Sequence, residues 1–166
     1  QYKVYFHIIG DFFSLREREE YMSIIKENHL APYVILHGRQ AGQMLDLLFE
    51  LCDFGIGSLG RHRSGITNIK TLKNREYAAR GIPFIYSEID EDFENMPYIM
   101  KIPANEEAVD IKQILNFYNQ LHITPLEIRN SIRHLSWNNQ MKKVLDEMQK
   151  KDKINPNNNN IANFAT

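Results

Sequence analysis

Short apolar runs alternate with helical patterns along most of the chain. Five runs rich in β-branched and aromatic residues predict strands, and they cover residues 4–9, 33–37, 54–59, 82–87 and 98–102. The residues between them predict helices at about 16–28, 45–52 and 71–79, the last one ending at Gly81 as a C-cap. Two more apolar stripes, at 111–118 and 141–148, predict helices in the remaining part.

Repeated strand–helix–strand units with apolar strands predict a parallel sheet that helices cover on both faces. The expected fold class is therefore α/β, a Rossmann-like three-layer αβα arrangement over residues 1–150. Residues 151–166 contain the low-complexity stretch NPNNNN and are predicted to be disordered. Ligands of such folds bind beyond the carboxyl ends of the strands, so the loops after residues 9, 37, 59 and 87 are the places to search.

Composition narrows the class of protein. The 166 residues are 43% hydrophobic and 25% charged with a net charge of -1, which favours a globular protein and gives no global electrostatic case for nucleic acid. No apolar run reaches 18 residues and no signal peptide precedes the first strand, so a cytoplasmic protein is expected. The single cysteine, Cys52, excludes an internal disulfide, and the six histidines show no metal-ligand spacing.

One segment, residues 61–80, carries most of the candidate chemistry, and we call it the basic segment. It holds six basic residues and one acidic residue, Glu76. The basic residues are Arg61, Arg63, Lys70, Lys73, Arg75 and Arg80. Glycines at 60 and 65 permit a close backbone approach, and a following helix N-terminus favours an anion, so the segment suits a phosphate or diphosphate. The alternative is a solvated basic face that the acidic loop, residues 88–94 (EIDEDFE), balances.

Two single residues are also candidates. The Glu76 carboxylate could accept two ribose hydroxyls. Alternatively, because Glu76 follows Lys73 by one helical turn, the two could form an intrahelical ion pair. Arg16 follows the first strand and could reach a phosphate, although it also belongs to the charged run REREE. Gly10 stands alone after that strand, so the dinucleotide fingerprint G-x-G-x-x-G is absent.

The stretch CDFGIGSLG…SGITNIKTLKNREYAARGIPFIYS resembles the donor-binding half of GT-B glycosyltransferases (family 4-like, group 1). In that family a strand and a variable loop precede a helix that reads roughly Lys–x–x–Glu–Tyr–x–Ala–x–Gly–x–Pro, and another strand follows. The matching residues, in order, are Lys73, Glu76, Tyr77, Ala79, Gly81 and Pro83. The tripeptide Leu–Ser–Trp at 135–137 resembles the start of the family's last long helix.

The resemblance implies the C-terminal half of a two-domain GT-B enzyme that transfers a sugar from a nucleotide-diphosphate donor to an acceptor. Glu76 would bind the ribose hydroxyls, and Gly38 and Arg39 would lie near the base. Arg16 would support the leaving diphosphate as the catalytic residue. The diphosphate or the sugar would meet Arg63, Ser64, Gly65, Ile66, Thr67 and Lys73. No metal and no tightly bound cofactor are expected.

The resemblance also implies partners. The N-terminal acceptor-binding half would be a further domain of the same protein, any membrane contact would be made there, and this half alone would be inactive. A role in cell-surface polysaccharide synthesis fits the family. The chain departs from the family pattern at Asn68, where many members carry a first glutamate, and at Asp11, where many carry arginine. Two alternatives stay open: a nucleotide-sugar epimerase of GT-B architecture, and a non-enzymatic Rossmann-like nucleotide-binding module.

Overall fold

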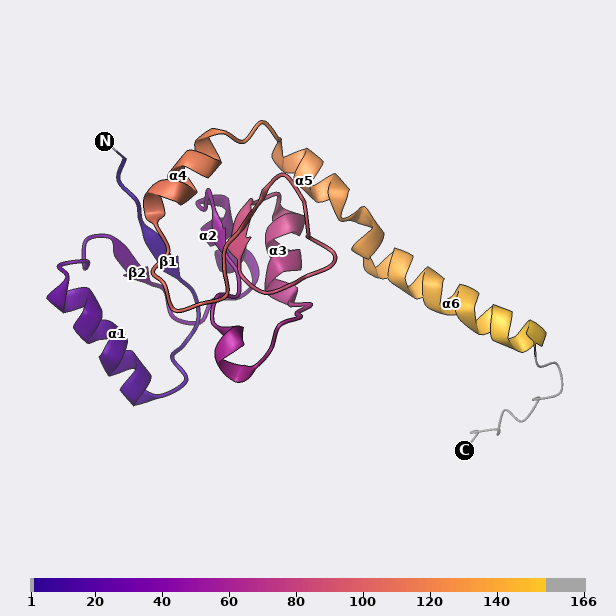
Figure 1. Ribbon diagram of the computed structural model, residues 1–166, viewed down its shortest axis with the longest axis horizontal. Helices are drawn as coiled ribbons and strands as arrows, with labels where there is room; N and C mark the ends of the chain where they lie inside the picture. Colours follow the sequence, from indigo (N-terminus) through magenta and orange to yellow (C-terminus); the bar gives the residue numbers. More distant parts are fainter. Residues whose placement is uncertain (1, 155–166) are drawn as a thin grey trace. The chain divides into compact units, whose positions relative to one another are not determined.

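The computed structural model describes residues 2–154 (Figure 1). Most of the tail predicted to be disordered, residues 151–166, lies outside them. The chain divides into two compact units, Gln1–Cys52 and Asp53–Thr166. Helices and parallel strands alternate in both units, so the α/β class expected from the sequence is confirmed.

The first unit contains a two-stranded parallel sheet and two helices. Strands β1 (Phe6–Ile8) and β2 (Val34–Leu36) pair along their whole length, and helix α1 (Leu15–Glu27) connects them. Ser14 caps α1 by accepting the Glu17 amide at 3.1 Å. Helix α2 (Gly42–Glu50) follows β2. The loops after the two strands meet, because the Gly10 amide donates to the Gly38 carbonyl at 2.8 Å.

The second unit is built on a three-stranded parallel sheet of order β3-β4-β5. These strands are β3 (Gly55–Ile56), β4 (Phe84–Tyr86) and β5 (Ile99–Lys101). The short 3-10 helix η1 (Arg61–Ser64) and helix α3 (Leu72–Arg80) form the crossover from β3 to β4. The acidic loop, rather than a helix, leads from β4 to β5. The central strand β4 is fully buried, as expected for a strand that is apolar at every position.

The core of the second unit lies where β4 meets the helices. Phe84, Tyr86, Phe93 and Tyr98 are fully buried, and the Phe84 ring contacts the other three rings. Helix α5 (Pro125–Ser131) adds Ile128 and packs beside α3, as Figure 1 shows.

The end of α3 confirms the C-cap predicted from the sequence. Gly81 adopts the left-handed conformation with φ of 76°. A Cβ atom there would lie 2.5 Å from the Pro125 carbonyl oxygen, so the close packing of α3 on α5 also requires glycine.

The rest of the second unit is helical. Helix α4 (Ile111–Asn119) precedes α5, and the 3-10 helix η2 (Arg133–Leu135) leads into α6 (Trp137–Ile154). Helix α6 extends past residue 150, where the sequence predicted the tail to begin. Among the helices that the structure describes, none combines the length and apolar character needed to cross a membrane.

All five predicted strands are present within their predicted runs, each shorter than the run itself. Pro83 stands directly before β4, at the beginning of the strand as predicted, and its carbonyl accepts the Gly55 amide at 2.8 Å. The described strands pair as two small sheets, whereas the sequence analysis expected one continuous sheet.

Candidate anion-binding site

The candidate site lies at the carboxyl ends of β3 and β4. Backbone hydrogen bonds join the two chain segments there, because Gly57 donates to Ile85 at 2.8 Å and Ser87 donates to Ser58 at 3.0 Å. Since the strands are parallel and α3 crosses between them, the loops after both strands and the start of α3 meet at this edge. This is one of the places that the sequence analysis selected.

Gly57 lets α3 approach the end of β3 closely. A Cβ atom at this position would lie 2.8 Å from the Ile85 carbonyl oxygen and 2.9 Å from Asn74 Oδ1. The face of α3 toward β3 carries Lys73, whose ammonium donates to the Gly57 carbonyl at 3.4 Å, and Tyr77, whose hydroxyl donates to the Ile56 carbonyl at 3.1 Å. The first turn of α3 therefore delivers a lysine to the edge of the sheet.

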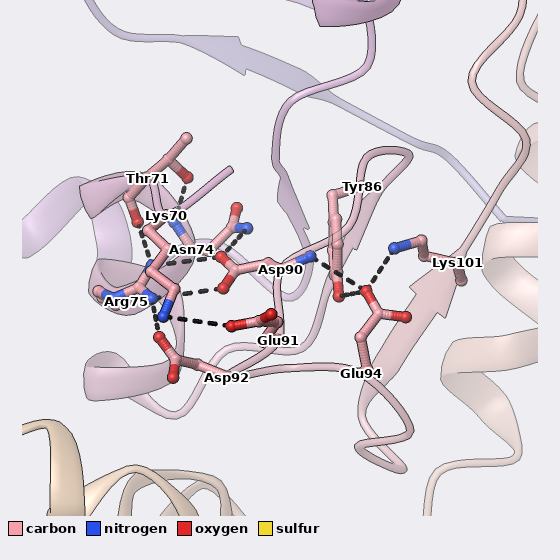
Figure 2. Close-up of polar contacts among 10 residues, drawn as sticks. All are labelled: Lys70, Thr71, Asn74, Arg75, Tyr86, Asp90, Glu91, Asp92, Glu94 and Lys101. Carbon is pink, nitrogen blue, oxygen red and sulfur yellow. Dashed lines mark hydrogen bonds and ion pairs between the residues drawn. The ribbon is translucent and has the colours of Figure 1, made fainter. Parts of the chain in front are cut away.

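The other face of α3 binds the acidic loop (Figure 2). Asp90 is fully buried and accepts from Asn74 Nδ2 at 3.1 Å. Arg75 donates to both oxygens of Asp90, at 3.2 and 3.3 Å, and also pairs with Asp92. A buried carboxylate needs such partners, so these bonds fix the acidic loop on α3. Lys70 adds an exposed ion pair to Glu91 at 3.5 Å.

The end of the acidic loop is held on β4 and β5 by a second group of contacts, also drawn in Figure 2. Glu94 accepts from the Tyr86 hydroxyl at 2.9 Å, from Lys101 Nζ at 2.6 Å and from the Asp90 amide at 3.1 Å. Burial acts to raise the pKa of Glu94, but the hydrogen bonds from these three donors outweigh it and lower that pKa. Lys101 also lies 4.2 Å above the Tyr86 ring.

Four of the six basic residues in the basic segment are neutralised by carboxylates. Lys70 and Arg75 pair with the acidic loop, Arg80 pairs with Glu76 at 2.6 Å, and Arg63 pairs with Glu106. Hydrogen bonds from Arg63 and then from His62 lower the pKa of Glu106 to about 2. For Lys70 and Arg75, the predicted alternative of a basic face balanced by the acidic loop agrees with the observed contacts, whereas Arg63 and Arg80 are balanced by carboxylates outside that loop.

Arg61 and Lys73 differ from the other four. In the part of the chain that the structure describes, neither side chain forms an ion pair with a carboxylate. Burial lowers the pKa of Lys73, the nearby Arg61 charge lowers it further, and the Glu88 carboxylate partly opposes both. Two adjacent cations that repel each other favour an anion at this position.

Glu88 is the site residue that the sequence analysis missed. It follows Ser87 at the end of β4, it is only 2% exposed, and its Oε1 atom accepts the Arg61 amide at 2.7 Å. Its Oε2 atom is buried without a hydrogen-bond partner among the described residues. The sequence analysis counted Glu88 as one charge of the acidic loop. Its place directly after an apolar strand was the signal that could have separated it from the exposed acids.

The predicted phosphate loop, Ser64 to Thr67, follows η1. Gly65 ends η1 with φ of 69°, and its amide donates to the His62 carbonyl at 2.9 Å. The Ile66 amide donates to the Arg61 carbonyl at 3.1 Å, and the Thr67 carbonyl accepts the Ile89 amide at 2.8 Å. The Gly65 and Ile66 amides are therefore engaged within the loop, where they hold the turn that carries Arg61.

The remaining predicted site residues lie elsewhere on the chain. Glu76, on α3 beyond Lys73, is half exposed and its ion pair is with Arg80 rather than with that lysine. Gly38, Arg39 and Arg16 belong to the first unit. Gly38 adopts φ of 65°, Arg39 pairs with Asp11 at 2.7 Å, and Arg16 pairs with Glu20 at 2.9 Å.

Among the described residues, no three or more histidine, cysteine, aspartate or glutamate side chains are grouped to hold a metal ion. No protein-family model matches the chain, and neither a curated protein nor a solved structure matches it. The glycosyltransferase family therefore stays a prediction from the sequence motif.

Proposed function

We propose that this chain is the donor-binding half of a GT-B glycosyltransferase and that Arg61 and Lys73 bind the diphosphate of a nucleotide-sugar donor. The observation that carries the proposal is the pairing of charges in the basic segment. Four of its six cations have carboxylate partners. The other two, Arg61 and Lys73, lie close to each other at the carboxyl end of β3.

The surroundings of these two cations suit a diphosphate. The N-terminus of α3 lies next to them, and the free amides and helix dipole at such a position favour negative charge. Lys73 is exposed by surface area, but partial desolvation near the end of β3 lowers its pKa, and a less solvated ammonium attracts an anion more strongly than a fully solvated one. In a transfer reaction the same cations stabilise the negative charge that develops on the leaving diphosphate.

The ribose is assigned to Glu76. Its carboxylate lies one helical turn beyond Lys73 on α3, and it is exposed enough to accept two hydroxyl groups. The proposal also includes a Rossmann-like fold and an acceptor-binding half in another domain of the protein. The roles that the sequence motif implies for Gly38, Arg39 and Arg16 stay predictions from that motif.

The test is a calorimetric titration of UDP, GDP, ADP, dTDP and NAD into the chain. We expect one nucleoside diphosphate to bind. We expect Lys73→Met to weaken its binding by about tenfold or more, since a charge-assisted hydrogen bond contributes about 1.5–3 kcal/mol. Lys70→Met is the matched control, because it removes the same charge from an exposed lysine that already pairs with Glu91.

Two further comparisons sharpen the test. Arg61→Gln should weaken nucleotide binding. Arg63→Gln removes a cation that already pairs with Glu106, so it should change the dissociation constant by no more than about twofold. Glu76→Ala should weaken the nucleoside diphosphate but not inorganic pyrophosphate, which lacks a ribose. Equal losses in Lys73→Met and Lys70→Met would contradict the assignment of the diphosphate to Lys73.

A further inference from the structure

Three buried side-chain atoms among the described residues have no hydrogen-bond partner: His62 Nδ1, Asn74 Oδ1 and Glu88 Oε2. They come from η1, from the first turn of α3 and from the residue after Ser87. These are the segments that meet at the carboxyl ends of β3 and β4. A buried polar atom without a partner is costly, and native proteins hold few of them. Their concentration at one edge of the sheet therefore points to a ligand that supplies the missing partners.

We propose that Glu88 Oε2, together with Asn74 Oδ1, accepts hydrogen bonds from hydroxyl groups of the sugar that the diphosphate carries. This inference rests on the proposed function, because it assigns a second part of the same ligand. Both atoms are acceptors, so the group that binds them must donate. A diphosphate oxygen cannot donate, and the adjacent charges of Arg61 and Lys73 disfavour a cation. A hydroxyl group is neutral and donates.

The backbone joins the cations and the acceptors into one site. The Arg61 amide donates to Glu88 Oε1 at 2.7 Å, and this bond leaves Oε2 for another donor. Asn74 follows Lys73 directly, and its Nδ2 atom is held by Asp90 at 3.1 Å, which fixes the orientation of the amide and leaves Oδ1 as the unpartnered acceptor. In a nucleotide sugar the diphosphate is bonded directly to the sugar. The cations Arg61 and Lys73 are likewise next to the acceptors Glu88 and Asn74, so adjacent parts of the ligand would meet adjacent parts of the site.

The decisive variant is Glu88→Gln. The glutamine carbonyl still accepts the Arg61 amide, but an NH₂ donor replaces the acceptor Oε2. The loss of a negative charge near Lys73 leaves the affinity for a diphosphate unchanged or higher. The loss of the acceptor weakens the binding of the nucleotide sugar but not that of the nucleoside diphosphate. Damage to the fold would weaken both ligands, so the two effects can be separated.

The measurement is the ratio of two dissociation constants, that of the nucleotide sugar over that of its nucleoside diphosphate, for UDP-glucose with UDP and for GDP-mannose with GDP. In Glu88→Gln we expect the ratio to rise by about tenfold for the pair that binds, since a hydrogen bond to a charged group is lost. Glu91→Gln removes the same charge from an exposed residue of the same loop and should leave the ratio unchanged.

The outcomes are distinct. An unchanged ratio in Glu88→Gln, or an equal weakening of both ligands, would overturn the sugar assignment and leave the diphosphate site standing. Absence of binding by the intact chain to every nucleotide would overturn the proposed function and this inference with it. If Glu88→Gln lowers the urea midpoint, Glu88→Asp provides a second reading. It keeps the charge and withdraws the carboxylate by one methylene, so the same rise in the ratio is expected.

Discussion

Removing Arg75 should destabilise the second unit strongly, because it leaves the fully buried Asp90 carboxylate without its cation. In Arg75→Met the aliphatic part of the side chain is kept, so the lost interaction is chiefly the pair with Asp90 and Asp92. Breaking a buried ion pair by removing one partner costs about 3–5 kcal/mol. Asn74 still donates to Asp90, and Arg75 is itself 21% exposed, so we expect the lower end, about 3 kcal/mol.

The exposed pair Lys70–Glu91 provides the internal standard. It joins the start of α3 to the same loop, but its side chains are 61% and 78% exposed, so Lys70→Met should cost no more than about 1 kcal/mol. The assay is urea unfolding followed by circular dichroism at 222 nm. With a slope of about 1–3 kcal/mol per molar urea, the midpoint should fall by roughly 1–3 M for Arg75→Met and by at most about a third of that for Lys70→Met.

A second substitution identifies the physical cause. In the Arg75→Met background, Asp90→Asn removes the buried charge that was left unpaired, so it should recover part of the lost stability. Comparable midpoints for Arg75→Met and Lys70→Met would refute the reasoning, because burial would then have no bearing on the two pairs. A further loss on adding Asp90→Asn would show that Asp90 does not need a cation.

Three other predictions concern the same edge of the sheet. Gly57→Ala should cost about 1–3 kcal/mol in urea unfolding, because its methyl group would meet the Ile85 carbonyl, and a wild-type midpoint would contradict that contact. The depressed pKa of Glu106, about 2 against an ordinary 4.5, contributes stability that is present above pH 4.5 and is lost as the pH falls toward 2. Glu106→Gln should therefore show a flatter dependence of the urea midpoint on pH over that window. In a reductively ¹³C-methylated sample, the Lys73 resonance should titrate below those of the other lysines and lower still in Glu88→Gln. A titration in step with the others would contradict the effects of partial desolvation and of Arg61 on the pKa of Lys73.

The elements of the fold could be read from the sequence because local pattern determines them. Apolar runs ending in glycine or preceded by proline marked the strands, and the Gly81 cap marked the end of α3. The pairing of strands into two sheets could not be predicted from that pattern, because the same apolar run is compatible with pairing on either edge. The link from β4 to β5 is an acidic loop whose sequence lacks a helical pattern of apolar residues. Its course depends on the hydrogen bonds of the buried Asp90 and of the partly exposed Glu94.

The sequence predicted the edge of the sheet at which the candidate site lies, but not which of its charged residues pair with one another. Counting charges in a window of twenty residues treated all six cations alike, whereas the folded chain brings acids from positions 90, 91, 92 and 106 to three of them. The pairing partners lie 15 or more residues away in sequence, so a local charge count cannot find them. Lys73 was predicted as a member of the cluster, and its role there stays a prediction. The contact that distinguishes Lys73 from Lys70 is with the Gly57 carbonyl, and Glu88 accepts the Arg61 amide; both contacts depend on tertiary structure.

The most direct test of the site is a map of where a nucleoside diphosphate binds. Two-dimensional ¹H–¹⁵N spectra of the chain, titrated with UDP, GDP, ADP and dTDP, report every backbone amide. We expect one nucleotide to shift the amides of Gly57, Arg61, Lys73 and Glu88 first, with Asp92 and Lys70 little affected. Shifts confined to the acidic loop or to residues outside the second unit, or no shifts with any nucleotide, would contradict a diphosphate site at the carboxyl ends of β3 and β4.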